Sequence, residues 1–249
     1  MNLKLVLCTF AVIATLVAEA ANTNTTSKVT TNKLSLTATS QVPLAPTNTV
    51  EEVATNTAPQ LPGATYTNTV EMEFVKVSPF WAGRYEVTQK EFQKVMGFNP
   101  SNFNGDKHPV DNVSWNDAME FCKRLTKQEL KEKKLPEGFS YRLPTEDEWE
   151  FLMADASLKD AVTGVSGPRS GTAIVGSLAT NSIGLYDMRG NVMEFCLGDT
   201  SKAYRVLRGA SWQDRIEINL RPIFRSYCRP DERKNTFGFR CLLVQKPAE

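Results

Sequence analysis

The chain has 249 residues, of which 41% are hydrophobic and 23% are charged, and its formal net charge is +1. This length holds one sizeable domain with additional segments, or two small domains. The near-zero net charge excludes the strongly basic surface typical of general nucleic-acid-binding proteins, so we expect no nucleic-acid partner.

The first twenty residues have the pattern of an export signal. Lys4 supplies a positive start, residues 5–17 are mostly apolar, and Ala18-Glu-Ala20 matches a small-residue cleavage site. The apolar run is shorter than the roughly 20 residues that a membrane-spanning helix needs. We therefore predict a signal peptide over 1–20, no membrane span after cleavage, and a periplasmic, cell-envelope or secreted protein; an uncleaved anchor is the alternative.

The mature chain divides into a linker and one domain. Residues 21–69 are rich in Thr, Asn, Ser, Ala and Pro, a composition that buries too little apolar surface to fold and predicts a flexible linker. The domain is expected over 70–246. It opens with an alternating pattern over 70–77 and a second extended stretch over 80–87, both typical of strands.

Helix-capping patterns predict three helices. Thr88 and Glu91 form a capping box before a helix over 89–96, and Ser114 caps a second helix. The Lys- and Glu-rich residues 127–134 are expected to extend this second helix or to surround its end, as a solvated face. A further capping box, Thr145–Glu148, begins the third helix.

Beyond the third helix, loops predominate. Short strands are expected only over 204–207 and 237–243. The mixture of helices, short strands and long loops indicates an α+β domain.

One loop is rich in oxygen ligands. Residues 181–195 read Asn-Ser-Ile-Gly-Leu-Tyr-Asp-Met-Arg-Gly-Asn-Val-Met-Glu-Phe, too glycine-rich for a helix and too polar for a buried strand. Asn181, Asp187, Asn191 and Glu194 offer the oxygens that a hard cation prefers. The alternative is that these side chains bind the loop backbone without an ion.

Six motifs resemble, in order and spacing, the formylglycine-generating enzymes, also called sulfatase-modifying factors. The resemblance covers roughly Val70 to Val244 and implies a loop-rich fold that elaborates the C-type-lectin fold. It also implies that Asn191 and Glu194 bind a structural calcium ion. The motifs are residues 85–92, 109–122, 141–149, 181–195, 208–212 and 238–241.

Four cysteines remain once Cys8 is assigned to the signal: Cys122, Cys196, Cys228 and Cys241. An even number in an exported protein predicts disulfides, and the sequence leaves three pairings open. The resemblance favours Cys122 with Cys241. Cys196 and Cys228 then form a second disulfide, stay as buried free thiols, or, least favoured, provide a displaced two-thiolate copper site.

The catalytic residues of the resembling enzymes are absent. Those enzymes oxidise a sulfatase cysteine with O₂ and a Cu(I) ion held by two thiolates, the ligands that Cu(I) prefers. The resemblance puts this pair between residues 208–212 and Arg225, but residues 213–224 contain no cysteine. The single histidine, His108, also excludes a multi-histidine iron site. We therefore expect copper to be unlikely and the protein to be non-catalytic.

The last fifth of the chain concentrates arginines. Arg208 and Arg240 are expected to be buried, and Ser211, Trp212, Arg221 and Arg225 to line a groove for a peptide, glycan or protein partner. A salt-bridged surface is the alternative. Two other functions stay open: a copper- and O₂-dependent formylglycine-generating oxidoreductase with a displaced thiol site, and a structural component of an envelope assembly.

Overall fold

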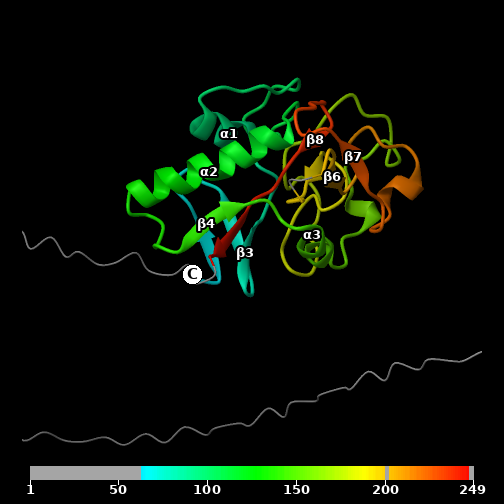
Figure 1. Cartoon of the computed structure of the whole chain (residues 1–249). Coiled ribbons are helices and arrows are strands. Elements are labelled where there is room, and N and C mark those ends of the chain that lie inside the picture. Colours follow the sequence, from blue (N-terminus) through cyan, green and yellow to red (C-terminus); the bar gives the residue numbers. More distant parts are fainter. Residues whose placement is uncertain (1–62, 200–201, 247–249) are drawn as a thin grey trace, which may run out of the picture. The chain divides into compact units, whose positions relative to one another are not determined.

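A computed structural model describes residues 63–199 and 202–246 of the chain. The predicted signal peptide over 1–20 lies outside the described residues, as does most of the predicted linker. Within the described ranges the chain forms an α+β domain with two separate sheets (Figure 1).

The first sheet has five antiparallel strands in the order β1-β2-β3-β9-β4. Strand β9 comes from the end of the described chain and lies between β3 and β4, so the sheet joins both ends of the domain (Figure 1). The strands are β1 (Thr65–Thr67), β2 (Glu73–Val77), β3 (Phe80–Gly83), β4 (Phe139–Arg142) and β9 (Leu242–Gln245).

The three predicted helices are confirmed. They are α1 (Gln89–Met96), α2 (Trp115–Lys131) and α3 (Glu146–Met153), and each begins with a capping box in which two backbone N–H groups find side-chain partners. Helix α2 packs on β4 and α1 (Figure 1). The loops contain two short 3₁₀ helices, η1 (Leu158–Asp160) and η2 (Glu217–Leu220).

The second sheet has four short strands in the order β7-β6-β5-β8, which leaves β7 at one edge. Strands β5 and β8 run parallel, and the other neighbours are antiparallel. The strands are β5 (Met193–Phe195), β6 (Arg205–Arg208), β7 (Ser226–Cys228) and β8 (Phe237–Gly238).

Two hydrophobic clusters hold these layers together. The larger joins α1, α2 and the first sheet to one face of the second sheet, through side chains such as Phe92, Phe121 and Phe239. The smaller lies between α3 and the first sheet and includes Trp149 and Leu242. Alternate residues of the second sheet therefore face different clusters, which matters for the cysteines below.

The folded region begins earlier than predicted. Strand β1 lies inside the stretch expected to be a linker, and it pairs with β2. The expected strand over 70–77 starts only at Glu73, because the Asn68 side chain accepts hydrogen bonds from the backbone N–H groups of Val70 and Met72. Glu71 has a positive φ of 75°, which completes this turn.

Residues 127–134 were expected to form a solvated face, but one of them is buried. Glu129 on α2 is fully buried and accepts hydrogen bonds from the Tyr66 and Tyr141 hydroxyls, at 3.2 and 2.6 Å. Burial, and to a lesser extent the Glu129 charge, raises the pKa of both tyrosines, that of Tyr66 to about 12. Glu129 continues the helical spacing of Cys122 and Leu125, a signal that the sequence already contained.

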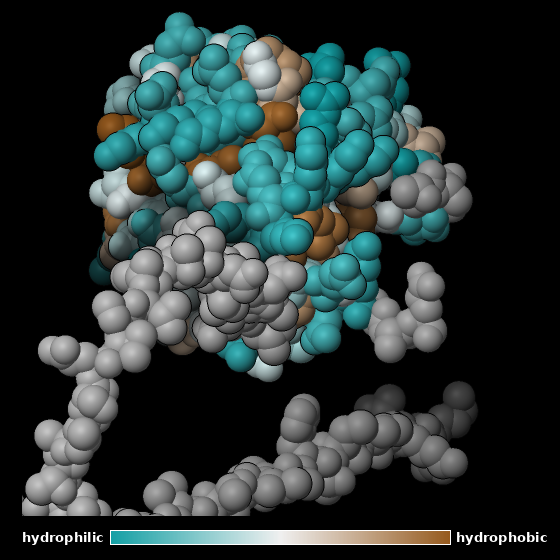
Figure 2. Space-filling view, turned by 90° about the vertical axis from the view of Figure 1, so that its left-hand side faces the viewer, coloured by the Kyte–Doolittle hydropathy of each residue, from teal (hydrophilic) through white to brown (hydrophobic). Residues whose placement is uncertain are grey.

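The surface seen from the side of α1, α2 and the first sheet is mostly hydrophilic. Figure 2 shows its apolar residues in separate patches rather than one continuous band. Within the residues that the structure describes, none of the helices is both long and apolar enough to cross a bilayer.

Candidate functional site

The oxygen-rich loop folds as a rigid turn before β5. Asp187 and Asn191 adopt positive φ values of 56° and 58°, and Gly190 has φ 86°. A side chain at Gly190 would collide with the carbonyl of Val162, so only glycine fits there. The prediction of a tight, non-helical loop is confirmed for residues 181–192. It is wrong for Met193–Phe195, which form the buried strand β5, because Arg240 neutralises the Glu194 carboxylate inside the fold.

Glu194 lies at the centre of this region in a buried ion pair with Arg240. The Arg240 Nη2 donates to Glu194 Oε1 at 2.6 Å, and Nε donates to both carboxylate oxygens. The Trp149 indole N–H donates to Oε2 at 2.8 Å. Both charged side chains are at most 1% exposed, so each depends on the other for neutralisation.

Arg240 also holds three separate segments together. Its guanidinium donates to the carbonyls of Gly83 at 3.0 Å and Tyr186 at 2.8 Å. Burial alone lowers the pKa of Arg240, but the charge and hydrogen bonds of Glu194 outweigh it and raise that pKa overall. The predicted burial of Arg240 is confirmed.

A second buried carboxylate, Glu86, was missed from the sequence. It accepts hydrogen bonds from Asn191 Nδ2 at 2.6 Å and from the Val192 N–H at 3.0 Å. Burial, followed by the charges of Asp187 and Glu194, raises the pKa of Glu86 well above its usual range. The environment thus favours the uncharged form, which leaves Arg240 balanced mainly by Glu194.

The other two oxygen-bearing residues are also engaged by protein donors. Asp187 Oδ2 accepts from the Gly176 N–H at 2.7 Å. Asn181 lies near the end of α3, where its Oδ1 accepts from the Leu185 N–H and its Nδ2 donates to the Leu152 carbonyl, at 2.9 and 2.8 Å. The Asn191 Oδ1 accepts from Ala173 N–H at 2.9 Å.

This arrangement does not fit a calcium centre built from Asn181, Asp187, Asn191 and Glu194. An ion at Glu194 would have to displace the guanidinium that already neutralises it. Among the described residues, no group of three or more His, Cys, Asp or Glu side chains is arranged to hold a metal. The alternative reading, side chains that bind loop backbone, matches the contacts.

Cys122 and Cys241 face each other in the larger cluster. Their Sγ atoms are 3.5 Å apart, both are buried, and both are thiols in this structure. Burial, followed by the contact with Cys122, raises the pKa of Cys241 well above its usual value. The structure therefore brings together the pair that the resemblance favoured, without the bond.

Cys196 and Cys228 do not meet. Strand β6 lies between them. The Cys196 N–H donates to the Val206 carbonyl, whereas Cys228 pairs with Arg205, the neighbour of Val206 in β6. Neighbouring residues of a strand point to opposite faces, so the two thiols belong to different hydrophobic clusters. The second disulfide and the two-thiolate copper site are both contradicted by this placement.

Both thiols are also poorly suited to metal chemistry as they stand. Burial raises the pKa of Cys228 to about 11 and that of Cys196 further still. The thiolate is the form that binds metals, so burial works against it at neutral pH.

The predicted groove residues separate into two sets. Ser211 and Trp212 are buried: the Ser211 hydroxyl donates to Asp214 at 2.8 Å, and Trp212 packs edge-on against Phe103 at 5.2 Å between ring centroids. They do not line an open groove, which corrects that expectation. Asp214 also accepts from the Asn219 amide at 2.9 Å. The polar side chains at the start of residues 213–224 therefore bond to one another.

The arginines mostly form ion pairs, as the alternative reading held. Arg208 is 1% exposed, as predicted, and contacts Glu146 and Glu150 at 3.1 and 3.0 Å. Arg225 is half-buried and bonds to the same Glu146. Arg221 is exposed, with no side-chain bond among the described residues.

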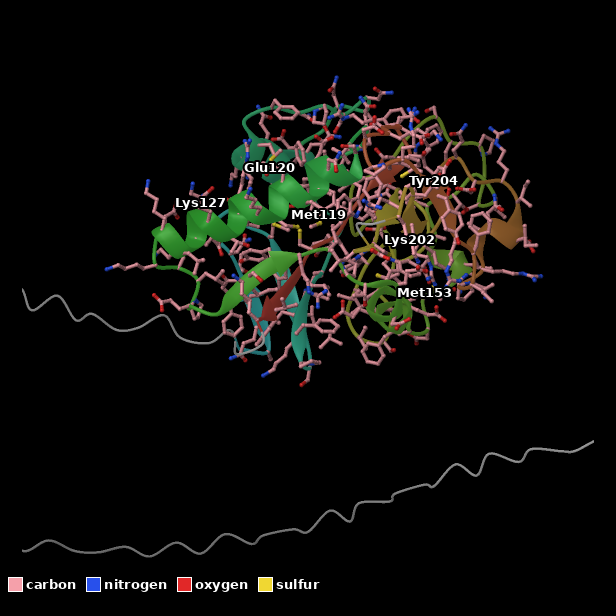
Figure 3. The ribbon with its side chains drawn as sticks, in the orientation of Figure 1. Met119, Glu120, Lys127, Met153, Lys202 and Tyr204 are labelled. Carbon is pink, nitrogen blue, oxygen red and sulfur yellow. The ribbon has the colours of Figure 1, made fainter. Side chains whose placement is uncertain are left out.

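An exposed aromatic face lies on the second sheet and was not predicted. Tyr204 and Tyr227 are 61% and 60% exposed, and Val206 lies between them, because Val206 pairs with Tyr227 and Tyr204 is two residues earlier. We call Tyr204, Val206 and Tyr227 the tyrosine face. Figure 3 shows Tyr204 and Lys202 in the half that holds this sheet, away from Lys127 on α2.

Comparison with known proteins identifies relatives across most of the chain. Residues 40–244 match the model of the sulfatase-modifying factor enzyme 1-like domain. "Chaperone protein LppX" of Paenibacillus barcinonensis is 31% identical over 198 residues, covering 55% of this chain and 71% of that protein. "Inactive C-alpha-formylglycine-generating enzyme 2" of Bos taurus is 32% identical over 163 residues, covering 53% of this chain and 49% of that protein.

A solved structure agrees with the fold. "Treponema denticola variable protein 1" superposes with a TM-score of 0.57 at 27% identity, over 75% of this chain and 93% of that one. The chain thus covers nearly all of this structure but only about half of the length of the bovine relative.

Proposed function

Because the chain belongs to the sulfatase-modifying factor enzyme 1-like family, the family of the formylglycine-generating enzymes, we propose that it is a non-catalytic member that binds a peptide or protein partner through the tyrosine face. The observation that carries this proposal is the pair of exposed tyrosines beside an open strand edge. The absence of a cysteine from residues 213–224 supports the non-catalytic part.

The thiol chemistry argues against an oxidase. Cu(I) needs two thiolates that reach one ion. Cys196 and Cys228 face different clusters, and Cys122 and Cys241 are buried in the core against each other. The displaced copper site therefore has no observation in its favour, and we retain no second candidate function. The bovine relative is named as an inactive enzyme, which agrees with loss of activity within the family.

The tyrosine face has the chemistry of an interaction surface. Tyrosine combines a large apolar ring with a polar hydroxyl and is enriched where proteins bind one another. Both tyrosines are more than half exposed, and the partly exposed Val206 adds apolar area between them. A surface of this kind loses little conformational entropy on binding, because each tyrosine has only two rotatable side-chain bonds.

Strand β7 adds a backbone element to this surface. It is the edge strand of the second sheet, so one side of Ser226–Cys228 has no strand neighbour among the residues that the structure describes. An extended peptide pairs naturally with such an edge, and its alternate side chains would then contact Tyr227. This geometry favours a peptide or protein segment over a glycan at this face.

The non-catalytic part is tested with an activity assay. The full chain is loaded with Cu(I) and incubated with O₂ and a sulfatase-type cysteine peptide, beside a formylglycine-generating enzyme as positive control. We expect no formylglycine by mass spectrometry. Formylglycine production that is lost in Cys196→Ser or Cys228→Ser would show that the protein is an oxidase.

The binding part is tested with a peptide-display library against the full chain. We expect enriched peptides to bind the unaltered protein and to bind Tyr204→Ser/Tyr227→Ser at least about tenfold more weakly, as expected when aromatic interface residues are truncated. Phe151→Ser, another exposed aromatic on α3, is the matched control. Equal affinity of all three proteins for the enriched peptides would refute the tyrosine face as the binding surface.

Export remains part of the proposal. The pattern of residues 1–20 supports a signal peptide, and the facing thiols of Cys122 and Cys241 support a disulfide once the protein reaches an oxidising compartment. Detection of the mature N-terminus at Ala21 in an extracytoplasmic fraction is the expected result.

A further inference from the structure

A second, chemically different site lies in a basin formed by two loops. Residues 102–108 and 168–172 enclose a volume of about 550 Å³, within the usual range for small-ligand sites. It is lined by Asn102, Phe103, Asn104, His108, Pro168, Arg169, Ser170, Gly171 and Thr172. None of these residues belongs to the tyrosine face, so the inference does not depend on the proposed function.

The two loops are fixed to each other, so the basin is preformed. His108 Nδ1 lies 2.9 Å from Thr172 Oγ1, a contact across 64 residues. The Val175 N–H donates to the Lys107 carbonyl at 3.0 Å. Gly171 packs directly on Phe103, where a Cβ atom would come within 2.7 Å of the ring. A preformed site pays less ordering entropy when a ligand binds.

The basin carries the positive charge of Arg169. Arg169 forms no ion pair among the described residues, and its buried Nε has no hydrogen-bond partner. None of the nine lining residues is acidic. The exposed Asp106 and Lys107 of the same loop are outside the lining. A buried, unpaired guanidinium donor is costly and is satisfied well by a planar or tetrahedral oxyanion.

The remaining wall offers hydrogen bonds of both kinds. The side chains of Asn102, Asn104 and Ser170 have no partner in the described structure, and amides and hydroxyls both donate and accept. The hydroxyl groups of a sugar also donate and accept, so they match this set. Phe103 adds apolar surface against which one face of a sugar ring can pack.

The same features fit a peptide less well. An extended peptide needs an open strand edge for its backbone, or apolar pockets for its side chains. The lining residues lie in no strand or helix, and Phe103 and Pro168 are their only sizeable apolar side chains. We therefore infer that this basin binds an acidic saccharide, a sugar whose carboxylate or sulfate group pairs with Arg169 while its hydroxyl groups bond Asn102, Asn104 and Ser170.

Isothermal titration calorimetry on the full chain tests this inference. The ligands are a galacturonate oligosaccharide, a sulfated galactose oligosaccharide, an uncharged galactose oligosaccharide and a tri-glutamate peptide. We expect at least one acidic saccharide to bind at least about tenfold more tightly than the uncharged one, the gain that a charge-assisted bidentate contact provides. Comparison of the two acidic ligands shows whether the basin prefers a carboxylate or a sulfate group.

Two variants assign the binding to the basin. Arg169→Met should lower the affinity for the acidic saccharide at least about tenfold, because the charge-assisted contact is lost. It should also remove the preference for this saccharide over the uncharged one. Asn104→Ala should weaken the binding of both the acidic and the uncharged saccharide. Arg221→Met, which removes an exposed arginine elsewhere, should change neither, and thermal melting verifies that each variant is folded.

Three results would overturn the inference. They are no measurable binding of either acidic saccharide, binding that Arg169→Met leaves unchanged, or a preference for the tri-glutamate peptide over both acidic saccharides. Because the tyrosine face is not altered in these variants, peptides that bind there keep their affinity whichever result is obtained.

Discussion

Two regions of the molecule hold an arginine beside residues that look suited to ligand binding, yet they differ in how their polar groups are satisfied. In the interior, Arg240 is surrounded by Glu194 and backbone carbonyls, and its partners leave it no free donor direction for a ligand. In the basin, Arg169 has neither an ion pair nor a partner for its buried Nε.

The comparison shows that residue type alone does not identify a site. The interior loop resembles a cation site in sequence, but its oxygens are already bonded within the protein. The basin has no recognisable motif, but the side chains of Asn102, Asn104, Arg169 and Ser170 have no bonding partner among the described residues. Completeness of hydrogen bonding therefore separates a structural network from a binding surface, because a buried polar group without a partner is costly until something binds it.

The largest effect is expected from breaking the interior pair. Arg240→Met leaves Glu194 buried without its counter-charge, and we expect the free energy of unfolding to fall by about 3–5 kcal/mol, measured by urea denaturation. Arg221→Met, on the surface, should stay within about 0.5 kcal/mol. Equal small losses in both variants would mean that the interior pair does not hold the three segments together.

The Cys122–Cys241 pair gives the next effect. If the oxidised protein carries this bond, Cys122→Ser should lower the free energy of unfolding by about 2–5 kcal/mol under non-reducing conditions. Peptide mapping with and without reduction should find Cys196 and Cys228 unlinked to each other. An unchanged melting temperature in Cys122→Ser would contradict the bond.

A pH dependence of stability, of intermediate size, is expected from Asp111, which lies beneath the basin. Asp111 accepts from the N–H groups of Asn102 and Phe103, at 2.8 and 3.3 Å, but its burial raises its pKa from 3.8 to about 6. Between these two values the folded protein holds a proton that the unfolded chain releases, so stability falls as pH rises through this window.

Asp111→Asn should remove this slope. The difference in unfolding free energy between the two proteins should therefore change, by no more than about 2 kcal/mol after solvent screening, between the acid and neutral ends of the window. Parallel urea titrations of both proteins measure it. Identical pH dependence of the two proteins would show that Asp111 does not titrate in this window.

Arg169→Met should hardly change stability, in contrast to Arg240→Met. Arg169 forms no hydrogen bond or ion pair among the described residues, so its loss should not lower the free energy of unfolding. Removal of its buried, unpartnered Nε should raise that free energy by no more than about 1 kcal/mol. A loss comparable to that of Arg240→Met would place Arg169 in the structural class and remove the basis for a ligand in the basin.

The smallest expected effect is that of calcium removal. Because Arg240 neutralises Glu194, we expect a chelator to leave the rate of proteolysis within residues 181–194 unchanged. Limited proteolysis with calcium in excess and with chelator measures it. Faster cleavage in chelator would favour the cation site that the family resemblance implied.

Local features were predictable from the sequence. The capping side chains at Thr88, Ser114 and Thr145 act within one helical turn, so the starts of α1, α2 and α3 could be located before any tertiary contact was known. The absence of a cysteine from residues 213–224 was equally plain, and the expectation of a non-catalytic protein was based on it.

Features that depend on distant partners could not be predicted. The sequence alone identified Glu194 as an oxygen ligand, but only the fold brings Arg240 to it across 46 residues. It left Cys196 and Cys228 as a possible pair, and only the register of β6 with β7 puts them on opposite faces. The sequence identified His108 only as the single histidine, and the fold places Thr172 beside it.

The sequence by itself therefore determined the helix starts, the α+β class and the absence of cysteine from residues 213–224. Tertiary structure alone decided which polar groups are satisfied, and hence which of them remain available to a ligand. The physical reason is that capping and hydrophobic periodicity are short-range, whereas the partner of a buried charge is chosen by packing between segments far apart in the chain.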